Sequence, residues 1–383
     1  MHSLEPTSSL LLHLSLIPHV GPLAIKRTMD MLERNGLSSL WLYRATVSDL
    51  EERGIACAQA EHIVAGLRDM KLFEEEMQLI EKYNVQVLFQ NDSAYPSWLR
   101  AIHAPPPVLY VQGSLEVLRQ QRLMSVVGSR AGNNYGRSVV EEFLPAAVAC
   151  EWGIVSGGAR GIDAHAHRIT LDYGGKTVAV LGSGLLKPYP PEHRSLFAEI
   201  AASGGAVVSP FPLRMSALPG NFPARNRIIA GMCKSCLVVQ AAEKSGALIT
   251  AAYALDEGRD VGVVPGSIFD PLSAGCHQLL RDGATPIASR NEFMSFLGLK
   301  AQQVAAQQVI ETVPRKISSP VVPAPQRSDN PLLIACRSTA RHFDELLPHA
   351  GGCPDELYRC LWELQLEGKI TQTVTGLWQK VAS

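Results

Sequence analysis

Short apolar runs alternate with amphipathic segments between Leu123 and Leu297. The runs that predict strands are Met124–Val127, Gly153–Val155, Val178–Leu181, Ala206–Val208, Cys236–Val239, Val261–Val264 and Pro286–Ala288. The segments between them predict helices that begin near Tyr135, Asp163, His193, Arg225, Ala247, Ser273 and Asn291. Strands that alternate with helices are typical of an α/β fold with a doubly wound parallel sheet, in which ligands bind beyond the carboxyl ends of the strands.

A helical pattern covers residues 1–95, with apolar spacings of three and four over Leu10–Leu16, Ala24–Leu32 and Ala58–Lys71. The segment Ile17–Ala24 resembles the turn of a helix-hairpin-helix, in which a helix N-terminus holds a phosphate. Because it contains one glycine, a plain helical turn explains it equally well. We predict an N-terminal helical domain of the sterile alpha motif or helix-hairpin-helix kind. Pro105–Pro107 predict a stiff spacer before the α/β domain, which we place at 105–298.

Beyond the α/β domain, residues 299–330 are rich in Gln, Pro and Ser and predict a linker. A C-terminal domain follows over 331–383, with helices predicted over Phe343–Leu347 and Asp355–Glu367 and a β hairpin around Gly376. This order is typical of a winged helix, which enters a DNA groove or mediates protein contacts. The second helix carries four acidic residues against one arginine, which argues against groove binding here.

The composition is that of a globular protein, with 46% apolar and 19% charged residues among 383. The formal net charge is -1, so a nucleic-acid partner would have to be held by a local basic patch. Residues 121–230 carry 11 basic and 7 acidic side chains, whereas residues 231–296 carry 5 and 7. This distribution fits one basic face and fits ordinary scatter equally well.

Targeting, membrane and metal signals are weak in this sequence. The N-terminus lacks the pattern of a signal peptide, and no run reaches about 18 apolar residues, so we expect a cytoplasmic protein without a membrane span. Eight cysteines without a dense framework indicate free thiols. The Cys233–Cys236 pair has no second pair at zinc spacing, which favours buried thiols over a metal site.

Glycine-rich loops follow the first two predicted strands. A glycine lets the backbone approach a ligand, serine and backbone N–H groups can hold a phosphate, and a guanidinium adds further donors. A tight strand-to-helix turn explains either loop as well when it is taken alone. The binding residues we predict here are Gly128, Ser129, Arg130, Ser156, Gly157, Gly158 and Arg160.

Two later segments add an aromatic ring and a further anion site. Phe222 precedes Arg225 and Arg227, and an exposed Phe beside Arg can stack on a nucleobase. The two arginines are too close in sequence to share one helical face, so we expect one to meet a phosphate and the other to brace the loop. Ser245 and Gly246 begin a helix whose N–H groups can hold another anion. Several such sites along one sheet edge suit a repeating phosphate chain.

The set of motifs resembles the DNA-processing protein A (DprA/Smf) family. The matching segments, in family order over about 175 residues, are Val127–Arg130, Ser156–Asp163 with Ala166 and His167, Phe222–Arg227, Ser245–Ala251 and Val264–Gly266. There are departures, since residues 217–221 supply no basic side chain before Phe222 and Gln240 stands where Glu is common. The flanking helical and winged-helix patterns match the family as well.

The resemblance implies a Rossmann-like domain that binds single-stranded DNA, forms a homodimer and loads the RecA recombinase during natural transformation. The resemblance implies that Gly128, Ser129 and Arg130 bind phosphate and that Phe222 stacks on a base. It also implies that Arg225 and Arg227 support the pocket and that His167 is structural. We expect neither catalysis nor a cofactor, since no P-loop is present.

The strongest alternative is a Rossmann-like nucleotide phosphoribohydrolase. Such an enzyme needs a phosphate loop and a Glu on the adjoining helix, whereas Glu243 lies in a loop with no acid–base partner. A nicotinamide oxidoreductase lacks its dinucleotide fingerprint here. An adaptor that acts through the winged helix leaves the basic central loops unexplained.

Overall fold

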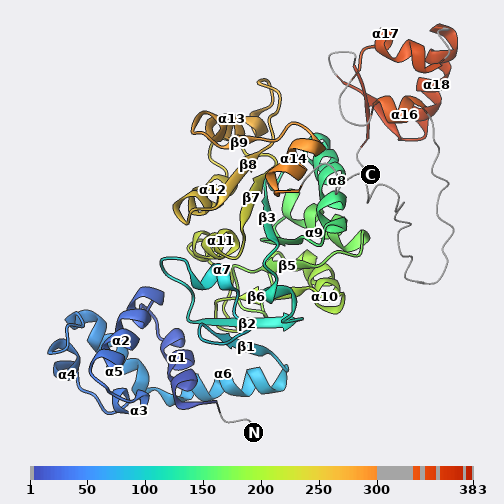
Figure 1. The fold of residues 1–383 in the computed structure, drawn as a ribbon. Coiled ribbons are helices and arrows are strands. Elements are labelled where there is room, and N and C mark those ends of the chain that lie inside the picture. Colours follow the sequence, from blue (N-terminus) through green and yellow to red (C-terminus); the bar gives the residue numbers. More distant parts are fainter. Residues whose placement is uncertain (1–3, 300–330, 337–340, 351–353, 374–376, 382–383) are drawn as a thin grey trace.

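A computed structural model describes residues 4–299, 331–336, 341–350, 354–373 and 377–381. At its centre lies one nine-stranded sheet in the order β1-β2-β6-β5-β4-β3-β7-β8-β9 (Figure 1). Its strands are β1 Gln86–Phe89, β2 Val108–Gly113, β3 Leu123–Val127, β4 Gly153–Ser156, β5 Thr177–Val180, β6 Ala206–Ser209, β7 Ser235–Val238, β8 Asp260–Val263 and β9 Thr285–Pro286.

The seven strands β3 to β9 pair in parallel, and their order reverses between β3 and β7. This confirms the predicted α/β fold with a large parallel sheet. The sheet is mixed, however, because β2 pairs antiparallel with both β1 and β6. This edge was not predicted, and β1 lies within the segment assigned to the N-terminal helices. Pro105–Pro107 are buried just before β2, so the expectation of a spacer there was wrong.

Helices cover both faces of the sheet, so its strands are apolar on both sides. Successive β3 residues alternate, with Met124 and Val126 packing toward α8, α9 and α14 and Val127 packing toward α11, α12 and α13. The helices around the sheet, including 3₁₀ turns labelled η, are α7 Ser97–Arg100, η1 Val117–Arg119, α8 Asn134–Ala149, α9 Ile162–Asp172, η2 Pro191–His193, α10 Arg194–Ala202, α11 Asn221–Gly231, α12 Gly246–Asp256, η3 Pro271–Ser273, α13 Ala274–Arg281 and α14 Arg290–Phe296.

Helix α11 begins at Asn221, four residues before the predicted start at Arg225. Phe222 therefore lies in the first turn of the helix and not in the loop before it. Because residues three apart share one helical face, Phe222 and Arg225 lie on the same side of α11. Arg227, two residues further on, is directed to another side, as the spacing predicted.

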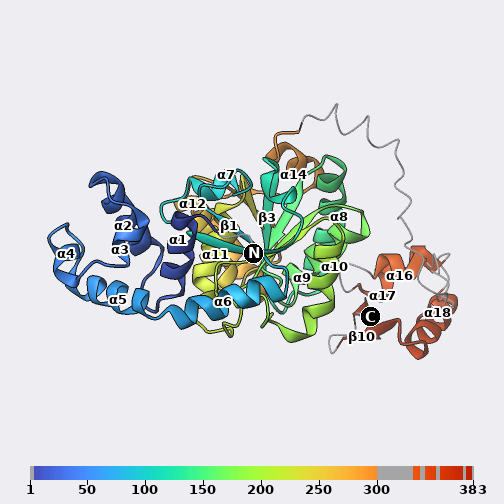
Figure 2. The same ribbon diagram turned by 90° about the horizontal axis from the view of Figure 1, so that it is seen from below.

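The N-terminal segment is helical before β1, and its last helix, α6, runs beside β1 (Figure 2). The single helix predicted over Ala58–Lys71 was wrong, because Asp69 leaves the helical region with φ -88° and ψ 79°. The assignment to a sterile alpha motif or helix-hairpin-helix domain stays a prediction. The helices are α1 Pro6–Leu16, α2 Pro22–Arg34, α3 Ser39–Leu42, α4 Val47–Glu51, α5 Cys57–Arg68 and α6 Met70–Lys82.

The described C-terminal residues form helices and one antiparallel strand pair with its own apolar cluster. The elements are α16 Pro331–Ala335, α17 Phe343–Leu346, η4 Leu347–Ala350, α18 Pro354–Leu366, β10 Ile370–Gln372 and β11 Trp378–Lys380. The linker predicted at 299–330 lies, apart from Leu299, outside the described residues, as does Gly376. The winged-helix assignment stays a prediction. No helix in the described parts of the chain has the length and apolar character needed to span a membrane.

Candidate nucleic-acid interface

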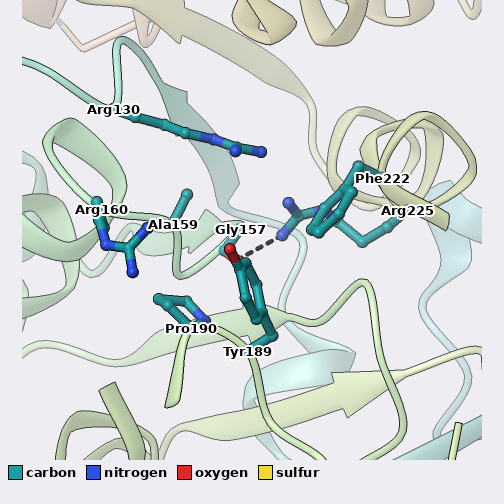
Figure 3. A pocket seen from close by; sticks show the side chains of 8 residues that line it. All are labelled: Arg130, Gly157, Ala159, Arg160, Tyr189, Pro190, Phe222 and Arg225. Carbon is teal, nitrogen blue, oxygen red and sulfur yellow. Dashed lines mark hydrogen bonds between the residues drawn. The ribbon is translucent and has the colours of Figure 1, made fainter. Parts of the chain in front are cut away.

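A pocket lies where β3, β4 and β5 end, opposite the first turn of α11 (Figure 3). The pocket is shallow and open to solvent, with a volume of only about 10 Å³ between its side chains. Three loops at the carboxyl edge of the sheet and one helix contribute to it, which is the edge where sequence reasoning expected a ligand. The pocket is lined by Arg130, Gly157, Ala159, Arg160, Tyr189, Pro190, Phe222 and Arg225.

The Phe222 ring is partly exposed and has cationic and aromatic neighbours. The guanidinium carbons of Arg130 and Arg225 lie 5.4 Å and 5.9 Å from the ring centroid, within the range of cation–π attraction. Tyr189 meets the ring edge-on, with centroids 5.8 Å apart and planes at 62°. A Cβ added at Gly182 would lie 3.0 Å from the Phe222 ring. The absence of a side chain at Gly182 therefore leaves room for that ring.

Arg225 is buried and braces the pocket floor. Its Nη1 donates to the carbonyl oxygens of Gly157, at 2.5 Å, and Val180, at 2.6 Å, which ties α11 to the ends of β4 and β5 (Figure 3). Burial lowers the pKa of Arg225 to about 10, an effect that the nearby Asp163 carboxylate opposes. Of the two roles left open for the paired arginines, Arg225 takes the bracing one.

Asp163 lies beneath the β4–α9 loop and is also buried. Its Oδ2 accepts hydrogen bonds from the backbone N–H groups of Gly157, at 3.1 Å, and Ala159, at 3.4 Å. Burial raises the pKa of this carboxyl, whereas Arg225 and the two N–H donors act in the opposite direction. The Asp163 carboxylate therefore offsets the positive charge of the buried Arg225 guanidinium. The positive charge that a ligand meets must come from another residue.

The glycines of the β4–α9 loop serve close packing. A Cβ on Gly157 would overlap Arg225 Nη1, and one on Gly158 would lie 2.5 Å from the Phe197 ring. Gly158 also has φ +61°, which glycine adopts without strain. Ser156 is fully buried, with its hydroxyl donating to the Val126 carbonyl. The structure thus places Ser156 and Gly158 behind the pocket surface.

The β3–α8 loop presents Arg130 and buries the preceding Ser129. The Ser129 hydroxyl accepts a hydrogen bond from the Ala131 N–H, and the Ser129 N–H donates to the backbone carbonyl of Gln240. A Cβ on Gly128 would collide with Ile162, so this glycine permits helix–strand packing. Arg130 is exposed, and no carboxylate of the described residues forms an ion pair with it. It is the cation of this loop that is free to meet a ligand.

Gln240 occupies the crevice between the ends of β3 and β7, where the strand order of the sheet reverses. Its amide donates to Asn133 Oδ1 at 2.9 Å and accepts from the Asn133 N–H at 3.2 Å. Such a crevice holds the dinucleotide in nicotinamide enzymes. Here the ligand pocket lies to one side, over β4 and β5.

Arg160 lies on the rim of the pocket, and its Nε donates a hydrogen bond to the Glu192 carboxylate at 2.5 Å. This hydrogen bond raises the pKa of Arg160. Seven of the predicted residues do not line the pocket: Gly128, Ser129, Ser156 and Gly158, which lie in the loops behind it, and Arg227, Ser245 and Gly246. Arg227 is half-buried near Tyr253, and burial lowers its pKa. Ser245 caps α12 by accepting from the Ala247 N–H, and Gly246 is exposed next to it. The α12 N-terminus is thus separate from the pocket.

Tyr189 and Pro190 were missed by sequence reasoning, although they line the pocket from the loop after β5. The signal was available, because the loops after the two preceding strands were singled out and this third loop ends at the same sheet edge. An aromatic residue in it was a candidate on that ground alone.

His167 and the Cys233–Cys236 pair are buried and do not line the pocket. His167 Nδ1 lies 2.7 Å from the Thr177 hydroxyl, and burial, with His193 and Arg225 nearby, lowers the pKa of His167 to about 3. Cys233 and Cys236 are buried thiols with raised pKa values.

The lining offers cations and rings and contains no carboxylate among the described residues that form it. Glu243, the acid considered for the hydrolase alternative, is exposed in the β7–α12 loop and does not line it. The described residues also hold no cluster of three or more His, Cys, Asp or Glu side chains arranged for a metal. Fold and pocket together define a mixed α/β protein with a large parallel sheet and an arginine- and aromatic-lined pocket at the carboxyl edge of that sheet.

Comparison with known proteins identifies the family. The model for DNA recombination-mediator protein A matches residues 86–298, and the chain belongs to that family. Protein Smf of Synechocystis is 39% identical over 289 residues, which cover 74% of this chain and 71% of that protein. DNA processing protein DprA of Streptococcus pneumoniae is 38% identical over 239 residues, which cover 61% of this chain and 84% of that protein.

The fold comparison agrees with the sequence comparison. The X-ray structure of DprA from Streptococcus pneumoniae superposes with a TM-score of 0.62 at 33% identity, covering 71% of this chain and 91% of that one. The resemblance to the DprA/Smf family drawn from the motifs is thereby confirmed. The chain is a DNA-processing and recombination protein of this family.

Proposed function

We propose that the pocket binds single-stranded DNA, with one base against Phe222 and the neighbouring phosphate on Arg130. The observation that carries the proposal is the partly exposed Phe222 ring with the exposed Arg130 guanidinium 5.4 Å away, since no described carboxylate forms an ion pair with that arginine. Stacking supplies affinity without sequence preference because every base has a π-face. The arginine supplies the electrostatic part, which weakens with salt.

A recessed ring favours a single strand over a duplex. Phe222 lies in a pocket formed by three loops, and Tyr189 meets its edge. A base inside a duplex is already stacked on its neighbours and cannot lie against the partly exposed Phe222 ring without flipping out. An unpaired strand offers both its bases and its phosphates.

The family and this pocket together suggest a mediator role that needs neither catalysis nor a cofactor. We infer that the protein acts in the cytoplasm as a homodimer, protects an incoming strand and loads RecA on it during natural transformation. Two pockets joined in a dimer would bind one strand with an avidity above that of either pocket. Mixing the protein with RecA and coated single strands tests the loading step, since filament formation should then become faster.

The binding proposal is tested by fluorescence anisotropy of a labelled oligo-dT across a salt series. We expect single strands to outcompete duplex, with a log–log salt slope of about -0.7 per phosphate contact. Arg130→Ala should make the slope shallower by about one contact, whereas Arg119→Ala, an exposed arginine paired with Glu116, should leave it unchanged. Equal binding of duplex, or an unchanged slope for Arg130→Ala, would contradict the proposal.

A further inference from the structure

Arg160 on the pocket rim is held by a carboxylate from the loop after β5. Its Nε donates to Glu192 Oε1 at 2.5 Å, and Figure 3 shows Arg160 across the pocket from Phe222. Arg160 lines the same pocket as Arg130, whereas Glu192 is not among the lining residues. The pocket therefore has a second arginine at its rim, and a carboxylate from outside the lining offsets the charge of that arginine.

Both members of this ion pair are in contact with solvent. The Arg160 side chain is 54% exposed and the Glu192 side chain 45%. An exposed ion pair contributes little, because water solvates both charges when the pair separates. The planar guanidinium presents the same donors to a phosphate as to a carboxylate. A phosphate that reaches the rim can thus replace Glu192 at a small cost in free energy.

The loop that carries Glu192 is held in place by other contacts. His193 Nδ1 lies 2.9 Å from the Gly158 carbonyl oxygen, which joins η2 to the β4–α9 loop. The His193 N–H donates to the Pro190 carbonyl oxygen at 3.1 Å, and the His193 ring meets the Phe197 ring edge-on. These contacts keep the loop in position when the Glu192 carboxylate is removed, so the effect of that carboxylate on binding can be measured separately.

We propose that Glu192 tunes the affinity of the DNA pocket by pairing with Arg160 until a phosphate of the strand replaces it. This inference rests on the proposed function, because the strand must first be held at Arg130 and Phe222. A single strand carries a phosphate on every nucleotide, so a strand in the pocket brings a second phosphate to the rim. Binding there includes breaking the ion pair, so Glu192 keeps the affinity below the value that two free arginines would give.

The test is a double-mutant cycle in the full chain, with labelled oligo-dT of about twenty nucleotides and fluorescence anisotropy as the readout. The variants are Glu192→Gln, Arg160→Ala and the two together, with Arg130→Ala as the test of the pocket itself. Glu199→Gln is the matched control, because it removes the carboxylate of another exposed ion pair, with Arg168, and changes the net charge equally. Neither member of that pair lines the pocket.

We expect Glu192→Gln to tighten binding by about two- to fivefold, because a phosphate then meets a free Arg160. Arg160→Ala should weaken binding and should abolish the gain from Glu192→Gln. Glu199→Gln should leave the dissociation constant unchanged.

Unchanged or weaker binding by Glu192→Gln would overturn this inference and leave the proposed function standing. An equal gain in the Arg160→Ala background, or with Glu199→Gln, would also overturn it, because the net charge alone would then explain the effect. If Arg130→Ala binds oligo-dT as tightly as the wild type and with the same salt slope, the proposed function itself fails.

Discussion

Arg130 and Arg225 both approach the Phe222 ring, yet one is exposed and the other buried. Arg225 donates through Nη1 to two backbone carbonyls, and the nearby Asp163 carboxylate offsets its charge, so it fixes the pocket. Arg130 forms no ion pair with any described carboxylate. The sequence spacing showed that Arg225 and Arg227 could not act alike. It could not show which was buried, because that depends on β4 and β5, which end about 70 and 45 residues earlier in the chain.

His167 gives a test of the buried layer under the pocket. Its pKa falls from an unfolded value of 6.5 to about 3, so below pH 6.5 the unfolded chain binds a proton that the folded chain does not. The free energy of unfolding should therefore fall with decreasing pH, by about 2 kcal/mol between pH 7 and pH 5 from this group. The His167→Asn variant should lack this part of the dependence. Urea denaturation of both proteins at the two pH values measures it, and parallel pH profiles would contradict the account.

The elements of the sheet were predictable because their apolar runs have strand length and alternate with helical spacing. All seven predicted strands are present, with ends shifted by one or two residues. Strands β1 and β2 were missed, since β2 follows three prolines and β1 lies in the segment that was assigned to the N-terminal helices. The early start of α11 was missed as well, because Pro223 made Asn221 and Phe222 look like a loop, although proline is tolerated in the first turn of a helix.

The glycines that precede and begin helices contribute unequally to stability. Gly158 has φ +61° and no room for a Cβ, whereas Gly246, in the first turn of α12, has open space around its Cα. Gly158→Ala should lower the free energy of unfolding by about 1–3 kcal/mol. Gly246→Ala should change it by less than about 1 kcal/mol and in the stabilising direction. Chemical denaturation of the two variants measures this, and equal effects would show that the loop tolerates a side chain.

At the scale of the whole molecule, the N-terminal helices are tied to the chain that leads into the pocket. Glu76 of α6 is buried, and its carboxylate accepts a hydrogen bond from the Leu213 N–H at 2.7 Å. Leu213 precedes α11, which carries Phe222. Neither the sequence pattern nor the family motifs indicated this contact, because it joins residues 137 positions apart.

Removing this contact should destabilise the protein. Glu76→Ala leaves the buried Leu213 N–H without a partner and should lower the free energy of unfolding by about 1–3 kcal/mol. The neighbouring Glu74 is exposed, so Glu74→Ala should have an effect below about 0.5 kcal/mol. Denaturation curves of the two variants compare them directly, and indistinguishable curves would mean that the helices are not coupled to the pocket in this way.

The central claim is that the Phe222 ring holds a base of single-stranded DNA. The most direct test is the dissociation constant of oligo-dT for Phe222→Leu and Phe222→Trp, measured by anisotropy at one fixed salt concentration. Phe222→Leu keeps apolar volume and removes the ring, so we expect a loss of about 1–3 kcal/mol, whereas Phe222→Trp keeps a stacking face and should stay within about threefold of the wild type. If Phe222→Leu binds oligo-dT as tightly as the wild type, the ring does not hold a base and the account of the pocket is wrong.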